Sequence, residues 1–147
     1  MFDNKCRAKR KDNGKWTVGY HVFDKQHYIL HDLYMVVRGT PELVNLVEVE
    51  PETLGRCSYM TDKTGQVIYE GDIVSWFDAE NLRYVVRFGR FANAVGTGYY
   101  SGVGFYLELY DDYKHTIPID AFKCENLYVK GNIVDNPDLL KREKKNV

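Results

Sequence analysis

The sequence predicts a mainly β chain (α+β overall), in which an amino-terminal β-rich portion packs on a carboxy-terminal small β-barrel and a short helix follows. Three observations predict this class. The chain contains 12 Tyr, 7 Phe and 2 Trp, and aromatic side chains fit the half-buried faces of sheets. It contains only four Pro. Its apolar runs are short and are interrupted at regular intervals by turn residues, as in sandwiches and barrels.

Length, composition and charge set the domain organisation. A chain of 147 residues is close to the commonest single-domain size. We therefore predict one domain over residues 1–147, with a β-rich portion at about 1–69, a barrel at about 70–135, and a helix and tail at 136–147. The hydrophobic content of 44% argues against disorder, and the net charge of −1 gives no overall field that attracts nucleic acid or an anionic membrane.

Turn signals divide the first half of the chain into short strands. Asn13-Gly14 favours a type I′ turn, because both central positions of that turn need a positive φ. It predicts a hairpin of strands at 6–11 and 15–23. In the second strand, alternate residues share one face: Trp16, Val18, Tyr20 and Val22. Further short strands are expected at 28–30, 34–38, 43–49, 56–60 and 66–69.

Turn residues also divide the second half of the chain at regular intervals. Five strands are predicted, at 73–77, 83–88, 104–110, 115–119 and 127–133, and such spacing describes a small barrel. Its expected core contains Ile73, Val85, Leu107 and Leu127. Residues 89–104 include five glycines and are expected to form a long hairpin connection. Asn136-Pro137 predicts the start of the terminal helix, since Asn caps helices and Pro suits the first helical position.

Cysteine usage and hydropathy predict a cytoplasmic protein without a membrane segment. The three cysteines, Cys6, Cys57 and Cys124, are far apart in the sequence. An odd, unclustered set indicates reduced thiols rather than disulfides or zinc ligands. Basic residues occupy the place where the apolar part of a signal peptide would begin. No apolar run approaches the ~20 residues that span a bilayer.

The chemistry-bearing residues predict neither an enzyme nor a metal or cofactor site. In an extended segment, His27 and His31 would lie roughly 13 Å apart, which is too far for shared coordination. Ser58, Ser75 and Ser101 lack an elbow motif, and no cysteine has a recognisable catalytic context. The glycines near residue 100 do not form a phosphate loop, because no Gly-Lys-Ser/Thr follows them.

Two stretches of sequence carry a family resemblance. The first runs from Val49-Glu50-Pro51-Glu52-Thr53-Leu54-Gly55 through Asp62-Lys63-Thr64-Gly65 to Ile68-Tyr69-Glu70-Gly71-Asp72-Ile73-Val74. The second is Gly131-Asn132-Ile133-Val134-Asp135-Asn136-Pro137-Asp138-Leu139-Leu140. Their order and spacing resemble the YopX family of phage and prophage proteins, although Lys9 and Arg56-Cys57 depart from its usual residues.

The resemblance implies a β-rich protein encoded by a phage or prophage and present in the cytoplasm of a bacterial host. The family provides no established activity to carry over. The Gly-Asp-Ile-Val entry to a strand also resembles SH3-like barrels, so the barrel is expected to be SH3-like. In Tyr69-Glu70-Gly71-Asp72, we expect Gly71 to allow a tight turn and Asp72 to accept backbone N–H groups within it.

Two sets of exposed side chains are candidates for binding. Aromatic residues near the glycine-rich segment are suited to contacts with protein partners, and we predict a protein-contact role for five of them: Tyr99, Tyr100, Tyr106, Tyr110 and Tyr113. Basic residues near the amino terminus form a candidate nucleic-acid patch: Arg7, Lys9, Arg10 and Lys11.

The leading hypothesis is a non-enzymatic binding protein that acts through protein–protein contacts and forms a homo-oligomer, with a host or phage protein as a possible partner. The first alternative is a nucleic-acid-binding phage regulator, which the near-neutral charge does not favour. The second alternative is a hydrolase that the sequence patterns do not reveal, because carboxylate pairs form in space rather than in sequence.

Overall fold

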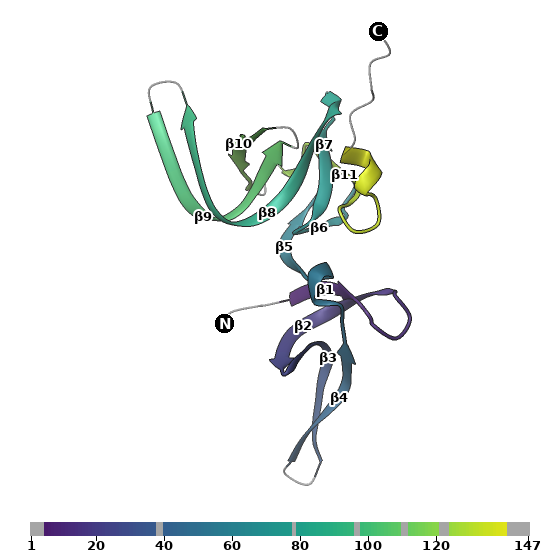
Figure 1. The fold of residues 1–147 in the computed structure, drawn as a ribbon. Coiled ribbons are helices and arrows are strands. Elements are labelled where there is room, and N and C mark those ends of the chain that lie inside the picture. Colours follow the sequence, from purple (N-terminus) through teal and green to yellow (C-terminus); the bar gives the residue numbers. More distant parts are fainter. Residues whose placement is uncertain are drawn as a thin grey trace. The chain divides into compact units, whose positions relative to one another are not determined.

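The computed structural model describes residues 5–37, 40–77, 79–95, 98–109, 112–120 and 124–140. These residues form eleven strands and two short 3₁₀ helices (Figure 1). The chain divides into two compact units, Met1–Cys57 and Ser58–Val147, which we call the amino-terminal and carboxy-terminal units. Because most of the described residues lie in strands, the prediction of a mainly β chain is confirmed.

The amino-terminal unit is an antiparallel sheet with the strand order β4-β3-β2-β1-β5. Its elements are β1 (Lys5–Lys9), β2 (Trp16–Asp24), β3 (Gln26–Val37), β4 (Thr40–Glu48), the 3₁₀ helix η1 (Pro51–Thr53) and the beginning of β5 (Gly55–Thr61). The two separate strands predicted at 28–30 and 34–38 are one continuous strand, β3, which pairs with β4 in a long hairpin (Figure 1).

The predicted hairpin of β1 and β2 is confirmed, but its turn is not type I′. Lys9 pairs with Trp16, and the Arg10 N–H donates to the Lys15 carbonyl at 2.9 Å. Four residues therefore form the loop, and of these only Gly14 has a positive φ, +70°. The Asn13 side chain instead accepts a hydrogen bond from the Lys15 N–H at 2.9 Å. An Asx interaction thus replaces the left-handed backbone that we expected at Asn13.

Alternation along β1 and β2 separates an inner face from an outer face. Cys6 and Ala8 are buried together with Ile29 and Val49, and Leu54 packs against this cluster. In β2 the buried residues are Thr17 and Gly19. The residues predicted to share a face of β2 therefore lie on the outer side of the sheet, where Val18 and Tyr20 are exposed.

The carboxy-terminal unit contains a five-stranded antiparallel sheet with the order β10-β9-β8-β7-β11. Its strands are β7 (Asp72–Trp76), β8 (Ala79–Val95), β9 (Gly98–Leu109), β10 (Asp112–Pro118) and β11 (Leu127–Asn132), and β6 (Val67–Tyr69) pairs with β5. Each of the five predicted strands overlaps one of the strands β7 to β11, but β8 and β9 are longer than predicted. The described strands form no closed barrel, however, because the edge strands β10 and β11 do not pair, so the SH3-like barrel is not confirmed.

Both faces of this sheet contain buried residues. Leu107 and Leu127 belong to one core cluster with Ile68, Val74, Tyr84, Val86 and Cys124. Ile73 and Val85 are also buried but pair with each other across β7 and β8. Their side chains lie on the face opposite Val74 and Val86, because successive residues of a strand alternate between faces. The predicted four-residue core is therefore correct in burial but divided between two faces.

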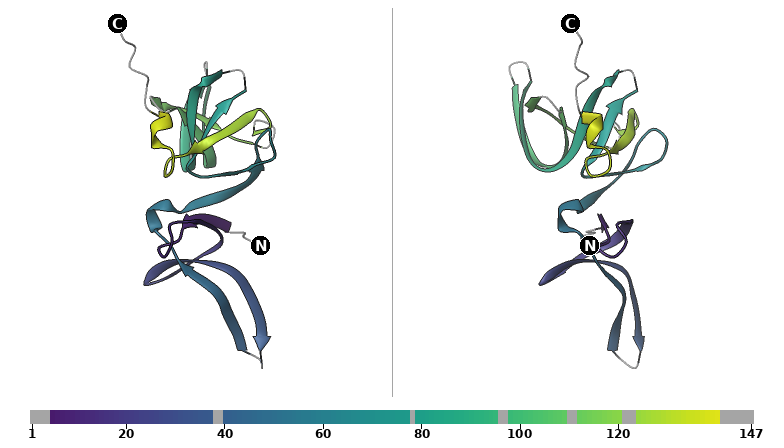
Figure 2. Two further views of the ribbon diagram at one scale, coloured as in Figure 1. Left: turned by 90° about the vertical axis from the view of Figure 1, so that its right-hand side faces the viewer. Right: turned by 45° about the vertical axis from the view of Figure 1, so that its right-hand side comes forward.

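The predicted loop at 89–104 is wrong. Residues 79–95 continue as β8, residues 98–109 form β9, and their register runs from Tyr84–Leu109 to Val95–Gly98 without interruption. Figures 1 and 2 show this hairpin as a long curved ribbon. The glycines in these strands do not interrupt them, because Gly89 pairs with Gly104 and the Phe91 ring covers Gly102.

The terminal helix predicted at 136–147 is not confirmed by the residues that the structure describes. Pro137–Leu140 form a single 3₁₀ helix, η2, and residues 141–147 lie outside the described part of the chain. Asn136 accepts from the Asn132 N–H at 3.2 Å, and the Arg83 guanidinium donates to the Leu139 carbonyl at 2.9 Å. Side-chain contacts to β8 and β11 thus hold this segment.

Candidate functional site

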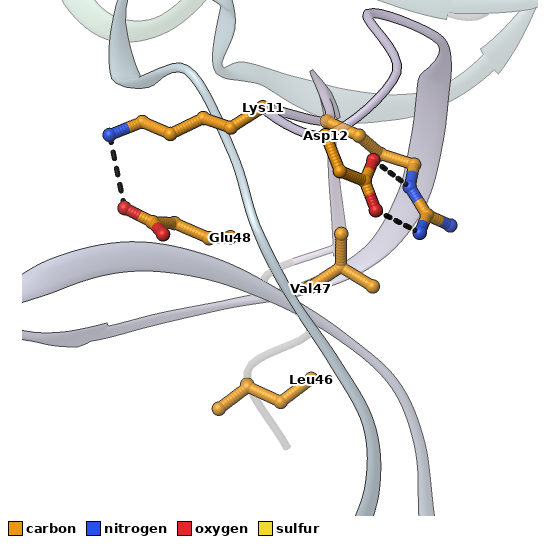
Figure 3. A pocket seen from close by; sticks show the side chains of 6 residues that line it. Lys11, Asp12, Leu46, Val47 and Glu48 are labelled. Atoms are coloured by element: carbon orange, nitrogen blue, oxygen red, sulfur yellow. Dashed lines mark hydrogen bonds and ion pairs between the residues drawn. The ribbon is translucent and has the colours of Figure 1, made fainter.

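The four basic residues predicted to form one patch divide into two pairs. Arg10 donates to Asp12 through two hydrogen bonds, at 2.8 Å from Nε and 2.7 Å from Nη2. Lys11 Nζ lies 3.0 Å from Glu48 Oε1. Both ion pairs line a shallow pocket of about 330 Å³, together with Leu46 and Val47 (Figure 3).

The charges in this pocket balance each other. The hydrogen bond to Glu48 raises the pKa of Lys11, and the hydrogen bonds from Arg10 lower the pKa of Asp12. Both shifts favour the ionised forms, so each cation remains paired with its carboxylate at neutral pH. A phosphate would have to displace a bidentate carboxylate from Arg10. The pocket is therefore a poor anion site, and Arg10 and Lys11 contribute little to a polyanion surface.

Arg7 and Lys9 lie beside an aromatic ring instead. The Arg7 guanidinium carbon lies 4.8 Å from the centre of the Trp16 ring, and Lys9 Nζ lies 5.4 Å from it. Lys9 is directly opposite Trp16 in the β1–β2 register, and Arg7 is opposite Val18. A cation above a ring keeps its charge while the ring orients it. The structure therefore joins two predicted basic residues to an aromatic residue that we had not included in the patch.

The predicted tyrosine set lies mostly along one hairpin. Tyr106 pairs with Arg87 of β8, and its ring centre lies 5.9 Å from that of Phe91. Burial raises the pKa of the Tyr106 hydroxyl, and nearby Glu108 raises it further, so the group remains neutral. For Tyr99, Tyr100 and Tyr113 the structure describes the backbone, in β9 and β10. Tyr110 lies outside the described residues.

An apolar row continues along the same hairpin beyond the core. The Phe88 and Phe105 rings meet edge to face, with their centres 4.9 Å apart. Val103 lies two residues before Phe105, on the same face of β9, and 72% of its surface is exposed. Because this row begins at the buried Leu107, it extends an apolar surface from the core to solvent. The tyrosine pattern alone did not reveal Val103.

The contact between His21 and His27 was not predicted from the sequence. His21 Nε2 and His27 Nδ1 lie 2.8 Å apart across the β2–β3 hairpin, with ring planes only 8° apart. Burial lowers the pKa of His21, and the charges of His27 and Arg56 lower it further. The tight turn at Lys25, which has a φ of +61°, joins β2 to β3 and so brings the two rings together. A search for histidines on one strand could not find it.

The residues that carry the family resemblance hold turns. Asp72 Oδ2 accepts the Tyr69 N–H at 2.8 Å, and Gly71 has a φ of +92°, as expected for this block. Thr53 Oγ1 accepts the Lys9 N–H at 2.8 Å and donates to the Glu50 carbonyl at 2.7 Å. These side chains satisfy backbone groups at strand ends, so the motifs specify architecture.

Other site classes find no support in the part of the chain that the structure describes. No group of three or more His, Cys, Asp or Glu side chains there could hold a metal ion. None of the described helices is long and apolar enough to cross a membrane. All three cysteines are free and buried. Burial and the charge of Asp120 raise the pKa of the Cys124 thiol to about 11.

Comparison with models of protein families gives a match over nearly the whole chain. The family model described as YopX protein matches residues 5–141, which include both stretches that carry the resemblance. A comparison with curated protein sequences finds no match.

Proposed function

We propose that this chain, which belongs to the YopX protein family, is a non-enzymatic binding protein that acts through protein contacts and associates with copies of itself. We further propose that a phage or prophage encodes it and that it acts in the cytoplasm of the bacterial host. The observation that carries the self-association is a two-stranded ribbon, formed by residues 88–95 of β8 and 98–105 of β9, which we call the β-ribbon.

The β-ribbon has two outer edges that pair with no other described strand. The register of β8 with β7 ends at Val85, and that of β9 with β10 ends at Tyr106. Beyond these points β8 and β9 pair only with each other among the described strands. Isolated two-stranded hairpins are marginally stable in water, and an unpaired edge is a template for another chain. Association would stabilise the β-ribbon, because a strand of a second chain would pair with the open edge and add to the two-stranded hairpin.

The backbone direction at one edge can be assigned. The Phe105 carbonyl accepts the Ile119 N–H at 3.2 Å, so the polar backbone groups of Phe105 point away from β8. Alternate residues of an antiparallel strand point the same way, and Val103 therefore presents its N–H and C=O to the outer edge. The exposed Val103 side chain lies beside these groups. A second β-ribbon could pair with this edge and cover the apolar row at the same time.

Light scattering coupled to gel filtration tests the proposal. We expect the wild-type chain at tens of micromolar to have a mass that is a multiple of 17.2 kDa. Val103→Pro should lower the mass toward one chain, because Pro removes the outward N–H yet is tolerated at a sheet edge. Val103→Glu should act similarly by placing a charge on the apolar row.

Val67→Glu provides the matched control. Val67 is also an exposed valine in a strand of the carboxy-terminal unit, but it lies in β6, outside the β-ribbon. Its variant should keep the wild-type mass, with circular dichroism showing that all variants are folded. A wild-type mass of 17.2 kDa would overturn the self-association. A larger mass that both Val103 variants retain would overturn the assignment to the β-ribbon.

A further inference from the structure

The outer face of β1 and β2 combines cations with aromatic rings. Residues of β1 alternate between half-buried and buried, and the buried ones are Cys6 and Ala8. The other three are all basic. The register places each opposite an apolar or aromatic residue of β2: Lys5 opposite Tyr20, Arg7 opposite Val18, and Lys9 opposite Trp16. We call these six residues the β1–β2 face.

The three cations form a row with a regular spacing. Residues two apart in a strand lie about 6.7 Å apart along it, so Lys5, Arg7 and Lys9 cover about 13 Å. Successive phosphates of an extended nucleic-acid strand lie at a comparable spacing. No residue of the β1–β2 face is acidic. Near the turn, Asp12 and Glu48 are held by Arg10 and Lys11, and Glu50 and Glu52 add negative charge near Lys11.

Aromatic surface lies next to the cation row. Tyr20 is 43% exposed, and Val18 beside it is 38% exposed. Trp16 is oriented by Arg7 and Lys9 at 4.8 and 5.4 Å from its ring centre. Proteins that bind single strands combine positive side chains that follow the phosphates with aromatic rings on which bases stack. Bases of a duplex already stack on each other, so exposed rings favour a single strand.

We propose that the β1–β2 face binds single-stranded nucleic acid, with Lys5, Arg7 and Lys9 contacting phosphates and Tyr20 and Trp16 stacking bases. Arg10 and Lys11, which the sequence suggested as part of the patch, are excluded because their carboxylate partners occupy them. The proposal is independent of the self-association, since the face and the β-ribbon belong to different units.

Fluorescence anisotropy with a labelled oligothymidylate measures this binding, and thymine contributes no self-structure. With three phosphates neutralised, the logarithm of the association constant should fall with the logarithm of salt concentration with a slope of about −2, which is about −0.7 per phosphate. Substituting Lys5 and Lys9 together with Ala should reduce this slope to about −0.7. Tyr20→Ala should lower the affinity by about fivefold or more through lost stacking.

The matched control replaces Arg10 and Lys11 with Ala, which removes the same number of charges from the same hairpin. We expect this variant to bind as the wild type does. Three results would overturn the proposal: no anisotropy change at micromolar protein and about 50 mM salt, an equal loss of affinity in the control, or an unchanged affinity of Tyr20→Ala. Tighter binding of a labelled duplex than of the oligothymidylate would also overturn it.

Discussion

Asp62 shows how much a single carboxylate can organise in this fold. Its Oδ1 atom accepts the Thr64 N–H at 2.8 Å, the Thr64 hydroxyl at 2.7 Å and the Gln66 N–H at 3.0 Å. Its Oδ2 atom accepts the Val129 N–H at 3.0 Å. The first three bonds shape the turn between β5 and β6, and the fourth joins that turn to β11. Asp62 is buried, so its loss leaves several donors without acceptors.

Replacing Asp62 with Asn should lower the free energy of unfolding by at least about 2 kcal/mol. The amide keeps one acceptor oxygen, and its NH₂ group cannot accept a hydrogen bond. In one orientation the Val129 N–H therefore loses its acceptor, and in the other the Thr64 and Gln66 donors lose theirs. Urea denaturation followed by circular dichroism measures the change. Glu125→Gln makes the same chemical substitution at an exposed position of the same unit and should change the free energy by less than about 0.5 kcal/mol. Equal effects would contradict this role of Asp62.

Asp62 should also make stability depend on pH in the acid range. Burial raises its pKa, but the hydrogen bonds from Val129, Thr64 and Gln66 lower it more, so the folded pKa lies below 3.8. The stabilisation is therefore present above pH 3.8 and is lost as the pH falls through the folded pKa. Urea titrations from pH 5 downward should show a shallower loss for Asp62→Asn than for the wild type. Parallel curves would contradict the shift.

His21 should titrate below its usual pKa of 6.5 because of burial and the charges of His27 and Arg56. With a lowered folded pKa, the unfolded chain binds more protons as the pH falls from 6.5, so the amino-terminal unit loses stability there. An NMR titration of the ring protons should give a pKa for His21 below 6.5, and His27→Gln should raise it. A wild-type value at or above 6.5 would contradict the expected shift.

At the scale of elements, turn residues between strands predicted where most strands lie. Gly71-Asp72 placed the start of β7, and Asn13-Gly14 placed the β1–β2 hairpin. Glycines within strands misled the prediction at 89–104, because a glycine can mark either a turn or a place where a ring needs room. Phe91 covers Gly102 from the paired strand. Only the cross-strand register distinguishes the two cases, and it is a long-range property.

Close packing at Gly131 gives a prediction for the carboxy-terminal segment. A Cβ atom there would lie 2.5 Å from Asn136 Oδ1 and 2.9 Å from a Leu139 methyl group. Gly131→Ala should therefore displace η2 from β11 and lower the free energy of unfolding by about 1–3 kcal/mol. Gly104→Ala is the control, since its Cβ would meet nothing within 4 Å. Thermal unfolding of both variants tests this, and an unchanged midpoint for Gly131→Ala would exclude the clash.

At the scale of the whole molecule, the sequence predicted the class and most strands but not how they assemble. Periodicity reports which residues are buried, as it did for Leu107 and Leu127, but closure of a barrel depends on pairing between edge strands. The candidate sites show the same limit. Arg7, Lys9 and Tyr106 were identified from residue type alone. Trp16, Val103 and the His21–His27 pair were not, because strand pairing creates their surroundings.

The core of the carboxy-terminal unit gives the largest expected effect of a single substitution. Leu107 is fully buried and belongs to the main cluster, so Leu107→Ala should lower the free energy of unfolding by about 2–5 kcal/mol through lost burial and a cavity. Leu82→Ala provides a control at an exposed position of β8 and should change it by less than about 0.5 kcal/mol. Urea denaturation compares the two, and a Leu107 effect as small as that of Leu82 would contradict the assigned core.

The buried thiols make the chain suitable for site-selective chemical labelling. Only thiolates react rapidly with maleimides, and a pKa of about 11 keeps Cys124 almost entirely protonated at neutral pH. Cys6 and Cys57 are buried as well. A cysteine introduced at an exposed position, such as Ser101 of the β-ribbon, could then be labelled with a donor or an acceptor fluorophore while the native cysteines stay in place. Energy transfer between separately labelled chains would report their approach directly.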